Sequence, residues 1–390
     1  MSQDLIVSKH CGIDFPTEAM ATLEARHGAE LTSCLVAAKA QQTLFAADML
    51  IGNDFNDSLK SRFLSLCDGI LMLKLVFSVS ENWHECLYLL KDFANRFFAM
   101  EWIESFMIWL GPGQNGKGLL VRVLRELFGT YFVEMRLAIL TEKGRSADSP
   151  SPAWMDLRGC RLAVISEAEV SQSLVSATVK ILRDQTTIIS CRDLRQSNVQ
   201  WQPHFGMIIC SNSRVKFTSQ DGGIERSMAV IPYRFKFTGH ISEPHHRQCD
   251  PALKQMAPLL APQLLFLVMK FKQVFYPEGV VLSDSVIRPC PLGIVQASQD
   301  AMLGPLGGST ALEFLTDGNH CHITQIGAEA STVPQLIRAY LLYSETPYNR
   351  QSARAAGAEL QQHAVSVCGP AGRACLRPLG AASGFFAVGH

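Results

Sequence analysis

The sequence has no excess of charge of either sign, and few charged residues altogether. Lys and Arg number 35, Asp and Glu also number 35, and together they make up 18% of 390 residues. That share is below the roughly 25% typical of soluble proteins, whereas hydrophobic residues reach 47%. The composition excludes a disordered or fibrous protein, and no global positive field indicates nucleic acid as a partner. A chain of this length can build two or three well-buried domains.

Paired cysteines and long apolar runs are missing too. The twelve cysteines include no C-x-x-C pair, which favours reduced thiols in a cytosolic-type compartment over a disulfide framework. The first residues contain no apolar stretch of the signal-peptide type. The most hydrophobic stretches, 70–79 and 257–269, are interrupted by Lys74 and Pro262. Both are shorter than the ~20 residues of a membrane-spanning helix. We therefore expect an intracellular, soluble protein with no membrane segment, in either the cytoplasm or the nucleus of a host cell.

Short apolar runs alternate with helical patterns in the middle of the chain. Asn82 is a typical N-cap with Glu85 three residues later, and it predicts a helix over 82–100. The apolar runs that predict strands are 105–110, 161–166, 187–191 and 207–210. This alternation predicts an α/β fold whose buried strands are largely parallel.

A glycine-rich segment follows the first apolar run and precedes a helical pattern at 119–128. Its residues are Gly111, Pro112, Gly113, Gln114, Asn115, Gly116, Lys117 and Gly118, which match G-x-x-x-x-G-K. Glycines let successive backbone N–H groups curve round a phosphate, a helix N-terminus favours the anion, and the lysine reaches the outer phosphates. The Ser or Thr that normally follows as a Mg²⁺ ligand is replaced by Gly118. We interpret the segment as a nucleotide-binding loop; the alternative is a glycine-rich turn with a surface lysine.

The second apolar run ends in acids, Glu167 and then Glu169. In a nucleotide hydrolase, a carboxylate at the C-terminal end of a neighbouring strand holds Mg²⁺ through water and polarises the attacking water. Glu167 stands nearer the strand and is the first candidate for both roles. The alternative is a buried strand with solvated acids at its end.

Basic residues gather after this strand. From residue 180 to residue 247 there are ten Lys and Arg against five Asp and Glu, a local surplus inside a neutral chain. Lys180 lies on a predicted helix, and two extended runs around a polar turn predict a hairpin that carries Arg192 and Arg195. Such a patch suits the phosphates of a nucleic acid, and a solvated hairpin with ordinary ion pairs is the alternative.

Two further polar residues complete the set. Asn212 follows the apolar run 207–210, where an amide can orient the hydrolytic water and sense the third phosphate. Arg226 follows an exposed-looking turn. An arginine offered to a neighbouring subunit's ATP stabilises transition-state charge, worth roughly 10³–10⁵ in rate. Taken singly, each residue would more often be structural.

In this order, the motifs resemble the superfamily 3 helicase domain of the phage/plasmid primase and poxvirus-type helicase–primase family. The resemblance extends from about Tyr88 to Phe237, and more weakly to Ser285. The segments that carry it are Gly111–Lys117 with Asn115, Leu157–Glu167, Lys180–Arg195, Asn212 and Asp221–Arg226. One departure is that the family's Thr-Gly-Gly-Asp is replaced by Arg183-Asp-Gln-Thr186.

The resemblance implies an AAA+-like P-loop ATPase that assembles as a ring, usually a homo-hexamer, with ATP and Mg²⁺ between subunits and single-stranded DNA in the channel. It assigns Lys117 to the phosphates, Glu167 to metal and water, Asn212 to γ-phosphate sensing, Arg226 to the neighbour's nucleotide, and Lys180, Arg192 and Arg195 to DNA. The expected parts are a helical N-terminal region at 1–87, the ATPase core at 88–240, a helical extension at 241–288, a linker at 289–309 and a winged-helix domain at 310–390.

The leading hypothesis is an ATP-dependent DNA helicase motor in the replication of a virus or mobile element. No primase domain is expected in the first hundred residues, because they lack the clustered carboxylates of a primase. Whether a separate primase or other replication proteins act as partners is left open. Gly118 keeps open a hydrolysis-deficient nucleotide-binding ring or scaffold, and an AAA+-type protein remodeller would use the same ATP site without nucleic acid. His320-Cys-His322 and His245-His246 near Cys249 lack a second ligand cluster and are not interpreted as metal sites.

Overall fold

The computed structural model describes residues 17–45, 55–98, 105–142, 151–168, 173–184, 186–219, 222–276, 290–303, 321–324, 375–378 and 386–387. The chain divides into two compact units, residues 1–298 and 299–390. All the candidate site residues named above belong to the first unit.

The N-terminal part of the first unit is helical, as the sequence predicts. Its helices are α2 (Thr17–Leu23), a π-helical turn (Glu24–Gly28), α3 (Ala29–Phe45), α4 (Asp57–Gly69), α5 (Leu71–Val79) and α6 (Trp83–Phe98). Side-chain caps explain where two of them begin. Asn56 Oδ1 accepts a hydrogen bond from Leu59 N (2.9 Å) at the start of α4, and Asn82 Oδ1 accepts one from Glu85 N (3.0 Å) at the start of α6.

A five-stranded sheet forms the centre of this unit, with strand order β2-β3-β7-β1-β9. Its strands are β1 (Phe106–Leu110), β2 (Phe132–Glu134), β3 (Leu162–Ala168), β7 (Gly206–Ser211) and β9 (Met228–Pro232). Every pairing between them is parallel. The predicted α/β fold with a mostly parallel sheet is confirmed, and burial on both faces explains why β1 and β7 read as continuous apolar runs.

The apolar run 187–191 does not join this sheet. Its residues form β5 (Ile189–Cys191), which pairs antiparallel with β6 (Val199–Trp201) in a separate hairpin. The sequence correctly predicts a hairpin here, but Ile188 at its edge is 60% exposed. Periodicity alone does not separate a buried strand from a short hairpin strand.

The other helices and strands of this unit follow the glycine-rich loop in the chain. The helical ones are α7 (Lys117–Phe128), a 3₁₀ turn (Gly129–Tyr131), α8 (Ala138–Thr141), α9 (Pro152–Met155), α10 (Ser176–Arg183), α11 (Gly222–Ser227), a second 3₁₀ turn (Pro251–Gln255) and α12 (Ala257–Phe275). The remaining strands of the unit are β4 (Ser173–Leu174), β8 (Lys216–Phe217), β10 (Lys236–Thr238) and β11 (His246–Gln248). The pair β4–β8 and the pair β10–β11 form two-stranded ribbons.

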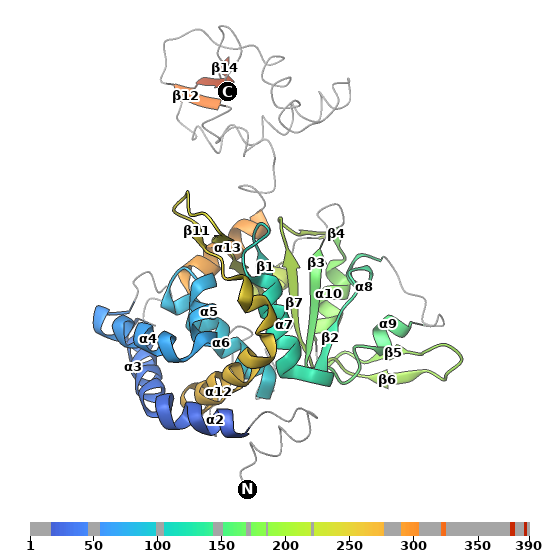
Figure 1. Ribbon diagram of the computed structural model, residues 1–390. Helices are drawn as coiled ribbons and strands as arrows, with labels where there is room; N and C mark the ends of the chain where they lie inside the picture. The colour runs from blue at the N-terminus through green and yellow to red at the C-terminus, as the bar shows by residue number, and fades with distance from the viewer. Residues whose placement is uncertain are drawn as a thin grey trace. The chain divides into compact units, whose positions relative to one another are not determined.

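The N-terminal helices and the sheet share one hydrophobic core. Figure 1 shows α2–α6 and α12 gathered on one side of the sheet, with α7 next to the strands. Leu73 of α5, Trp109 of β1 and Phe271 of α12 are all fully buried members of the same cluster. The boundary expected between residues 87 and 88 therefore falls inside α6 and inside a continuous core. The N-terminal helices pack as part of the unit that carries the glycine-rich loop.

The segment 289–309, expected to be a linker, contains helix α13 (Leu292–Leu303). Ile294 is fully buried in the core, and Ser298 Oγ accepts a hydrogen bond from Val230 N (2.8 Å) on edge strand β9. The Pro, Gly and Ser content suggested a linker, but the apolar residues between them hold a helix against the sheet. This part of the expected division is corrected.

In the second unit the structure describes three short strands, β12 (Cys321–Thr324), β13 (Cys375–Pro378) and β14 (Phe386–Ala387), paired antiparallel. The expected winged-helix domain at 310–390 lies almost wholly outside the described residues and stays a prediction. Among the helices that the structure describes, none has the length and apolar character needed to cross a bilayer.

Candidate functional site

The glycine-rich loop occupies the centre of the carboxyl edge of the sheet. It leaves β1, which lies between β7 and β9, and leads into α7 at Lys117. Gly111 N donates a hydrogen bond to Ser211 O (3.2 Å) at the end of β7. The next strand in sequence, β2, lies at the far edge of the sheet. Ligands of open parallel sheets bind at such a reversal of strand order, beyond the strand ends.

Two glycines are required by the shape of the loop. A Cβ on Gly111 would lie 2.4 Å from Tyr233 O and 2.8 Å from Asn115 Nδ2. Gly116 has a φ of +88°, which side chains rarely adopt, and a Cβ there would lie 2.9 Å from Val79 Cγ1. In contrast, a Cβ on Gly113 or Gly118 would meet no atom of the described residues within 4 Å.

Lys117 is buried at the bottom of the loop. Its Nζ donates to Gly111 O, to Ser211 O (3.1 Å) and to Asn212 Oδ1 (3.3 Å). Burial lowers the pKa of the Lys117 ammonium, since desolvation penalises the charged form. The lysine is therefore held by carbonyl oxygens at the place where the loop needs a positive charge.

The structure brings together two of the predicted site residues, Lys117 and Asn212. They are joined directly by the hydrogen bond between Lys117 Nζ and the Asn212 side chain, because β1 and β7 are neighbours in the sheet. Asn115 lies beneath the loop, where its Oδ1 accepts from Lys117 N (3.4 Å). Its Nδ2 is buried and has no hydrogen-bond partner among the residues that the structure describes.

The backbone of Glu167 lies near the C-terminal end of β3, the neighbour of β7. A register shift between Ile165 and Ala168 places Ala168 opposite Ser211. The end of β3 is therefore next to the strand end that contacts Lys117. The side chain of Glu167 and the whole of Glu169 lie outside the described residues, so the assignment of either to Mg²⁺ and water stays a prediction.

The loop is backed by a segment that the sequence analysis missed. Tyr233 N donates to Leu110 O (2.6 Å), and Phe237 N donates to Gln114 O (2.7 Å). Tyr233 is 2% exposed, and burial raises its pKa well above the ordinary value. These residues come more than a hundred positions after the loop and carry no motif. Their signal is the alternation of aromatic and basic residues in Tyr233–Phe237 directly after an apolar run.

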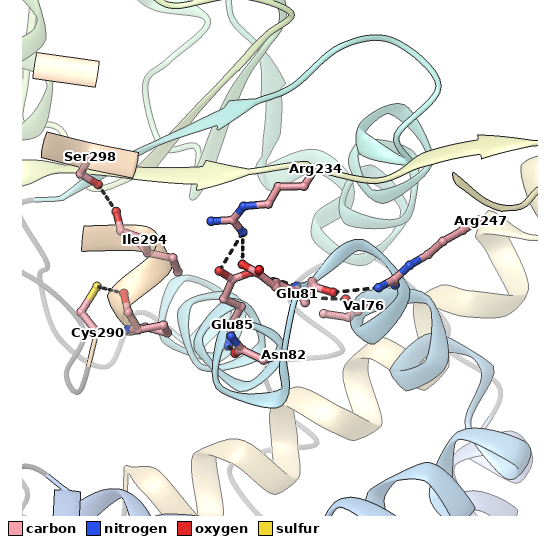
Figure 2. A network of polar contacts seen from close by, with 11 residues as sticks. Val76, Glu81, Asn82, Glu85, Arg234, Arg247, Cys290, Ile294 and Ser298 are labelled. Carbon is pink, nitrogen blue, oxygen red and sulfur yellow. Dashed lines mark hydrogen bonds and ion pairs between the residues drawn. The ribbon is translucent and has the colours of Figure 1, made fainter. Parts of the chain in front are cut away.

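Two arginines tie the same segment to the N-terminal helices, as Figure 2 shows. Arg234 Nη1 pairs with Glu81 Oε2 (2.7 Å) and Glu85 Oε1 (3.1 Å). Arg247 stacks on the Phe235 ring (3.4 Å to the ring centroid). Its guanidinium donates to the carbonyl oxygens at the end of α5, at Phe77, Ser78 and Ser80.

These arginine contacts hold α5 against the loop. Arg247 satisfies the last carbonyls of α5, which have no partner within a helix, and burial lowers its pKa. Val79, the last residue of α5, then lies beside Gly116. The N-terminal helices are thus part of the wall of the candidate nucleotide site.

The hairpin β5–β6 lies at the other end of the sheet. β6 ends at Trp201, shortly before β7 begins at Gly206, whereas the lysine contact is at the last residue of β7. Figure 1 shows the hairpin extending away from the sheet. Arg192 and Arg195 lie in its turn, and Leu194 between them is 66% exposed. Lys180 is half-buried on α10, before the hairpin.

Arg226 is also remote from the loop of its own chain. It is exposed on α11, just before β9, and β9 runs parallel to β1 with Leu110 opposite Pro232. At about 3.3 Å per residue, the five-residue strand separates Arg226 from the loop by roughly 16 Å. That is farther than an arginine side chain reaches.

The residues at the loop fit the phosphates of a nucleotide. The loop has four glycines that could surround a phosphate. A Cβ would collide with neighbouring atoms at Gly111 and Gly116 but not at Gly113 and Gly118. The N-terminus of α7, the Lys117 ammonium and the unpartnered Asn115 Nδ2 all favour an anion there. For Mg²⁺, Asn212 Oδ1 is one oxygen donor that the structure places beside Lys117.

Comparisons with known proteins point to one group. A protein named "Putative helicase" from Acanthamoeba polyphaga mimivirus is 27% identical over 188 residues, which cover 46% of this chain and 20% of the viral protein. A "Putative primase" from African swine fever virus is 25% identical over 148 residues, covering 37% and 15%. Over part of its length, the chain is similar in sequence to proteins of large DNA viruses that are named as helicases or primases. The matched part spans about one fifth or less of these viral proteins.

Other comparisons add little beyond this relationship. No protein-family model matches the chain. A solved structure of the C-terminal region of NrS-1 is 15% identical with a TM-score of 0.43, covering 63% of this chain and 54% of that one. A structure of JCV helicase is 12% identical with a TM-score of 0.31, covering 61% and 65%. The relationship to the viral helicase–primase proteins therefore rests on sequence.

Proposed function

We propose that this relative of viral helicase–primase proteins is an ATPase of the superfamily 3, AAA+-like type that moves along single-stranded DNA in replication. The observation that carries the proposal is the contact between Lys117 Nζ and Asn212 Oδ1 beneath a loop that excludes side chains at Gly111. Lys117 would hold the β- and γ-phosphates, and Asn212 would respond to the γ-phosphate. Glu167 and Asn212 would provide oxygens for Mg²⁺, which supplies neutralisation of phosphate charge when bound.

Single-stranded DNA is proposed as the track because of the hairpin. Arg192 and Arg195 lie in the connection between β5 and β6, and this hairpin extends away from the sheet (Figure 1). Guanidinium groups suit backbone phosphates. Lys180 stands on the helix that leads to this hairpin and is proposed as a further phosphate contact.

The position of Arg226 supports the proposal of a ring of subunits, usually a hexamer. The arginine cannot serve the loop of its own chain because a whole strand separates them. In a ring, the amino edge of one sheet can face the carboxyl edge of its neighbour. Arg226 would then stabilise charge on the neighbour's ATP, and each site would need two subunits.

One observation favours a second candidate. Gly118 removes the hydroxyl that the loop pattern normally offers to Mg²⁺, so a nucleotide-binding ring that does not hydrolyse ATP uses the same geometry. Protein remodelling is a third outcome, in which the exposed Leu194 would contact a polypeptide in place of DNA.

The deciding experiment is ATP hydrolysis with Mg²⁺, with and without single-stranded DNA, beside Lys117→Ala. Hydrolysis that DNA stimulates and the substitution abolishes supports the motor. ATP binding without hydrolysis overturns the motor in favour of the scaffold. Hydrolysis that Lys117→Ala abolishes but DNA does not change overturns the DNA assignment and leaves the remodeller.

A further inference from the structure

The connection between β10 and β11 ends in a tight turn that is rich in metal-type ligands. Its residues are Glu243, Pro244, His245 and His246, and His246 N donates to Glu243 O (2.9 Å) to close the turn. Proline at the second position sets the backbone angle of such a turn in advance. The three side chains that can bind a metal are therefore placed by a pre-formed backbone.

The donor atoms of these side chains converge. One atom from each of Glu243, His245 and His246 lies within 4.8 Å of the others. His245 Nε2 is 3.0 Å from Glu243 Oε2, and His246 Nε2 is 3.9 Å from the same oxygen. The rings are 4.7 Å apart at 73° to each other. Both imidazoles therefore direct Nε2 at one carboxylate from different angles, as ligands of a single ion do.

A second set of contacts orients His246. Its Nδ1 accepts a hydrogen bond from Ser242 N (3.4 Å) and lies 3.2 Å from Ser242 Oγ. With a metal on Nε2, the ring proton would move to Nδ1, which would then donate to Ser242 Oγ. Imidazoles that bind a metal through one nitrogen usually hold an oxygen with the other, which fixes the ring. The His246 side chain is only 11% exposed, whereas those of His245 and Glu243 are half exposed. One ligand is thus fixed, and two can adjust around an ion.

We propose that this turn binds a divalent cation of the Zn²⁺ class through Glu243, His245 and His246, with a further position open to water or to a partner's ligand. Two imidazole nitrogens and one carboxylate oxygen suit Zn²⁺, Co²⁺ or Ni²⁺, whereas Mg²⁺ prefers oxygen ligands alone. The site is distinct from the Mg²⁺ expected at the nucleotide and does not depend on the proposed function.

The position of the turn gives the ion a role. Lys236 N donates to His245 O (3.0 Å), and the next residue, Phe237, donates to Gln114 O (2.7 Å) of the glycine-rich loop. An ion at the turn would hold the β10–β11 ribbon in the geometry that backs this loop. From the sequence, His245-His246 near Cys249 were not interpreted as a metal site for want of further ligands, whereas the turn places Glu243 beside both histidines.

The test is a Co²⁺ titration of the whole chain after removal of metal with a chelator, followed by Co²⁺ absorbance and by competition with Zn²⁺. The chain has 11 His and 12 Cys, so the number of equivalents bound is compared between variants. Replacing both histidines, His245→Ala with His246→Ala, is expected to remove one equivalent. Ser242→Ala is expected to lower the affinity of that equivalent by about tenfold or more.

His240→Ala is the matched control, because His240 is exposed on the same connection but outside the turn. It is expected to bind as the wild type does, and Glu243→Gln is expected to weaken binding without disturbing the fold. If the double histidine variant binds the same number of equivalents with the same affinity as the wild type, the site does not exist. If His240→Ala loses the equivalent too, the ligand set proposed here is wrong.

Discussion

The two ends of the central sheet are built in opposite ways. At the carboxyl end, Lys117 and Asn115 are less than 10% exposed and held by backbone groups. At the amino end, the hairpin turn and Arg226 are exposed, and Leu194 is 66% exposed. A pre-organised, buried site suits chemistry on a small ligand. Exposed groups suit a long partner or a second subunit, so in the proposed function one sheet separates the two tasks.

The largest expected effect tests the tight packing at the carboxyl end. Gly111→Ala would place a Cβ 2.4 Å from Tyr233 O, so the backbone of the loop must move. We expect loss of nucleotide binding together with a destabilisation of roughly 1–3 kcal/mol. Nucleotide titration and thermal unfolding measure the two.

Gly118→Ala is the matched control, because a Cβ there meets no atom within 4 Å. It lies in the first turn of α7, where Ala in place of Gly stabilises by up to ~1 kcal/mol. Equal damage from both substitutions would contradict the packing described here. Gly118→Ser fits the same open space and tests whether a hydroxyl raises hydrolysis.

The second effect tests whether the carboxyl end of one subunit's sheet and the amino end of its neighbour's sheet form a shared ATP site. We expect Arg226→Ala to lower ATP hydrolysis by roughly 10³-fold or more, with nucleotide binding retained because the loop of the same chain is intact. Mixing it with Lys117→Ala should restore part of the activity, since some interfaces then pair an intact lysine with an intact arginine. A mixture no more active than its two components would refute the shared site.

The third effect concerns DNA binding by the hairpin, and the nucleotide site at the carboxyl end of the sheet is expected to be unaffected. Arg192→Ala with Arg195→Ala should reduce the salt dependence of single-stranded DNA binding, by about 0.7 in slope for each lost phosphate contact. Hydrolysis without DNA should not change, because the hairpin is remote from Lys117. Binding titrations at several salt concentrations measure this, with Lys60→Ala on α4 as the control. An unchanged slope would remove the hairpin from the DNA interface.

The sequence predicts the two ends of the sheet unequally well. The loop, its strand and its helix follow from a motif that is contiguous in the chain, and the Lys117–Asn212 contact follows from the rule that parallel strands end together. Val79, Tyr233 and Phe237 were missed as walls of the site. These residues contribute backbone hydrogen bonds and side-chain volume, neither of which produces a recognisable motif. Their contacts with the loop form only when segments distant in the sequence pack together.

The same limit explains the misassigned linker. The linker was predicted from the average composition of 289–309, which is dominated by prolines and glycines near its ends. The position of the helix depends instead on two single residues, Ile294 in the core and Ser298 bonded to β9. Site roles that depend on side chains, such as that of Glu167, stay predictions even where the strand is correct.

The smallest effect tests whether a buried charge in the N-terminal helices lowers the stability of the protein. Lys91 on α6 is buried, with Nζ 3.1 Å from Gln42 Oε1 and 4.6 Å from the Phe275 ring centroid. Burial, with a smaller contribution from Lys39, lowers the pKa of Lys91 to about 7. Between pH 7 and the ordinary lysine range the unfolded chain therefore binds more protons. Stability should rise with pH there, by up to about 1.4 kcal/mol per unit.

Lys91→Met should flatten this rise and stabilise the protein at pH 7 or below, where the wild type buries a charged amine. Urea unfolding at pH 6, 7 and 9 measures the difference, with Lys216→Met, an exposed lysine on β8, as the control. If Lys91→Met keeps the slope of the wild type, the buried amine is not the group that titrates. Because α6 is paired through Glu85 with Arg234, in the segment that backs the loop, a variant that is stabilised but binds nucleotide less tightly would link the charge to the loop.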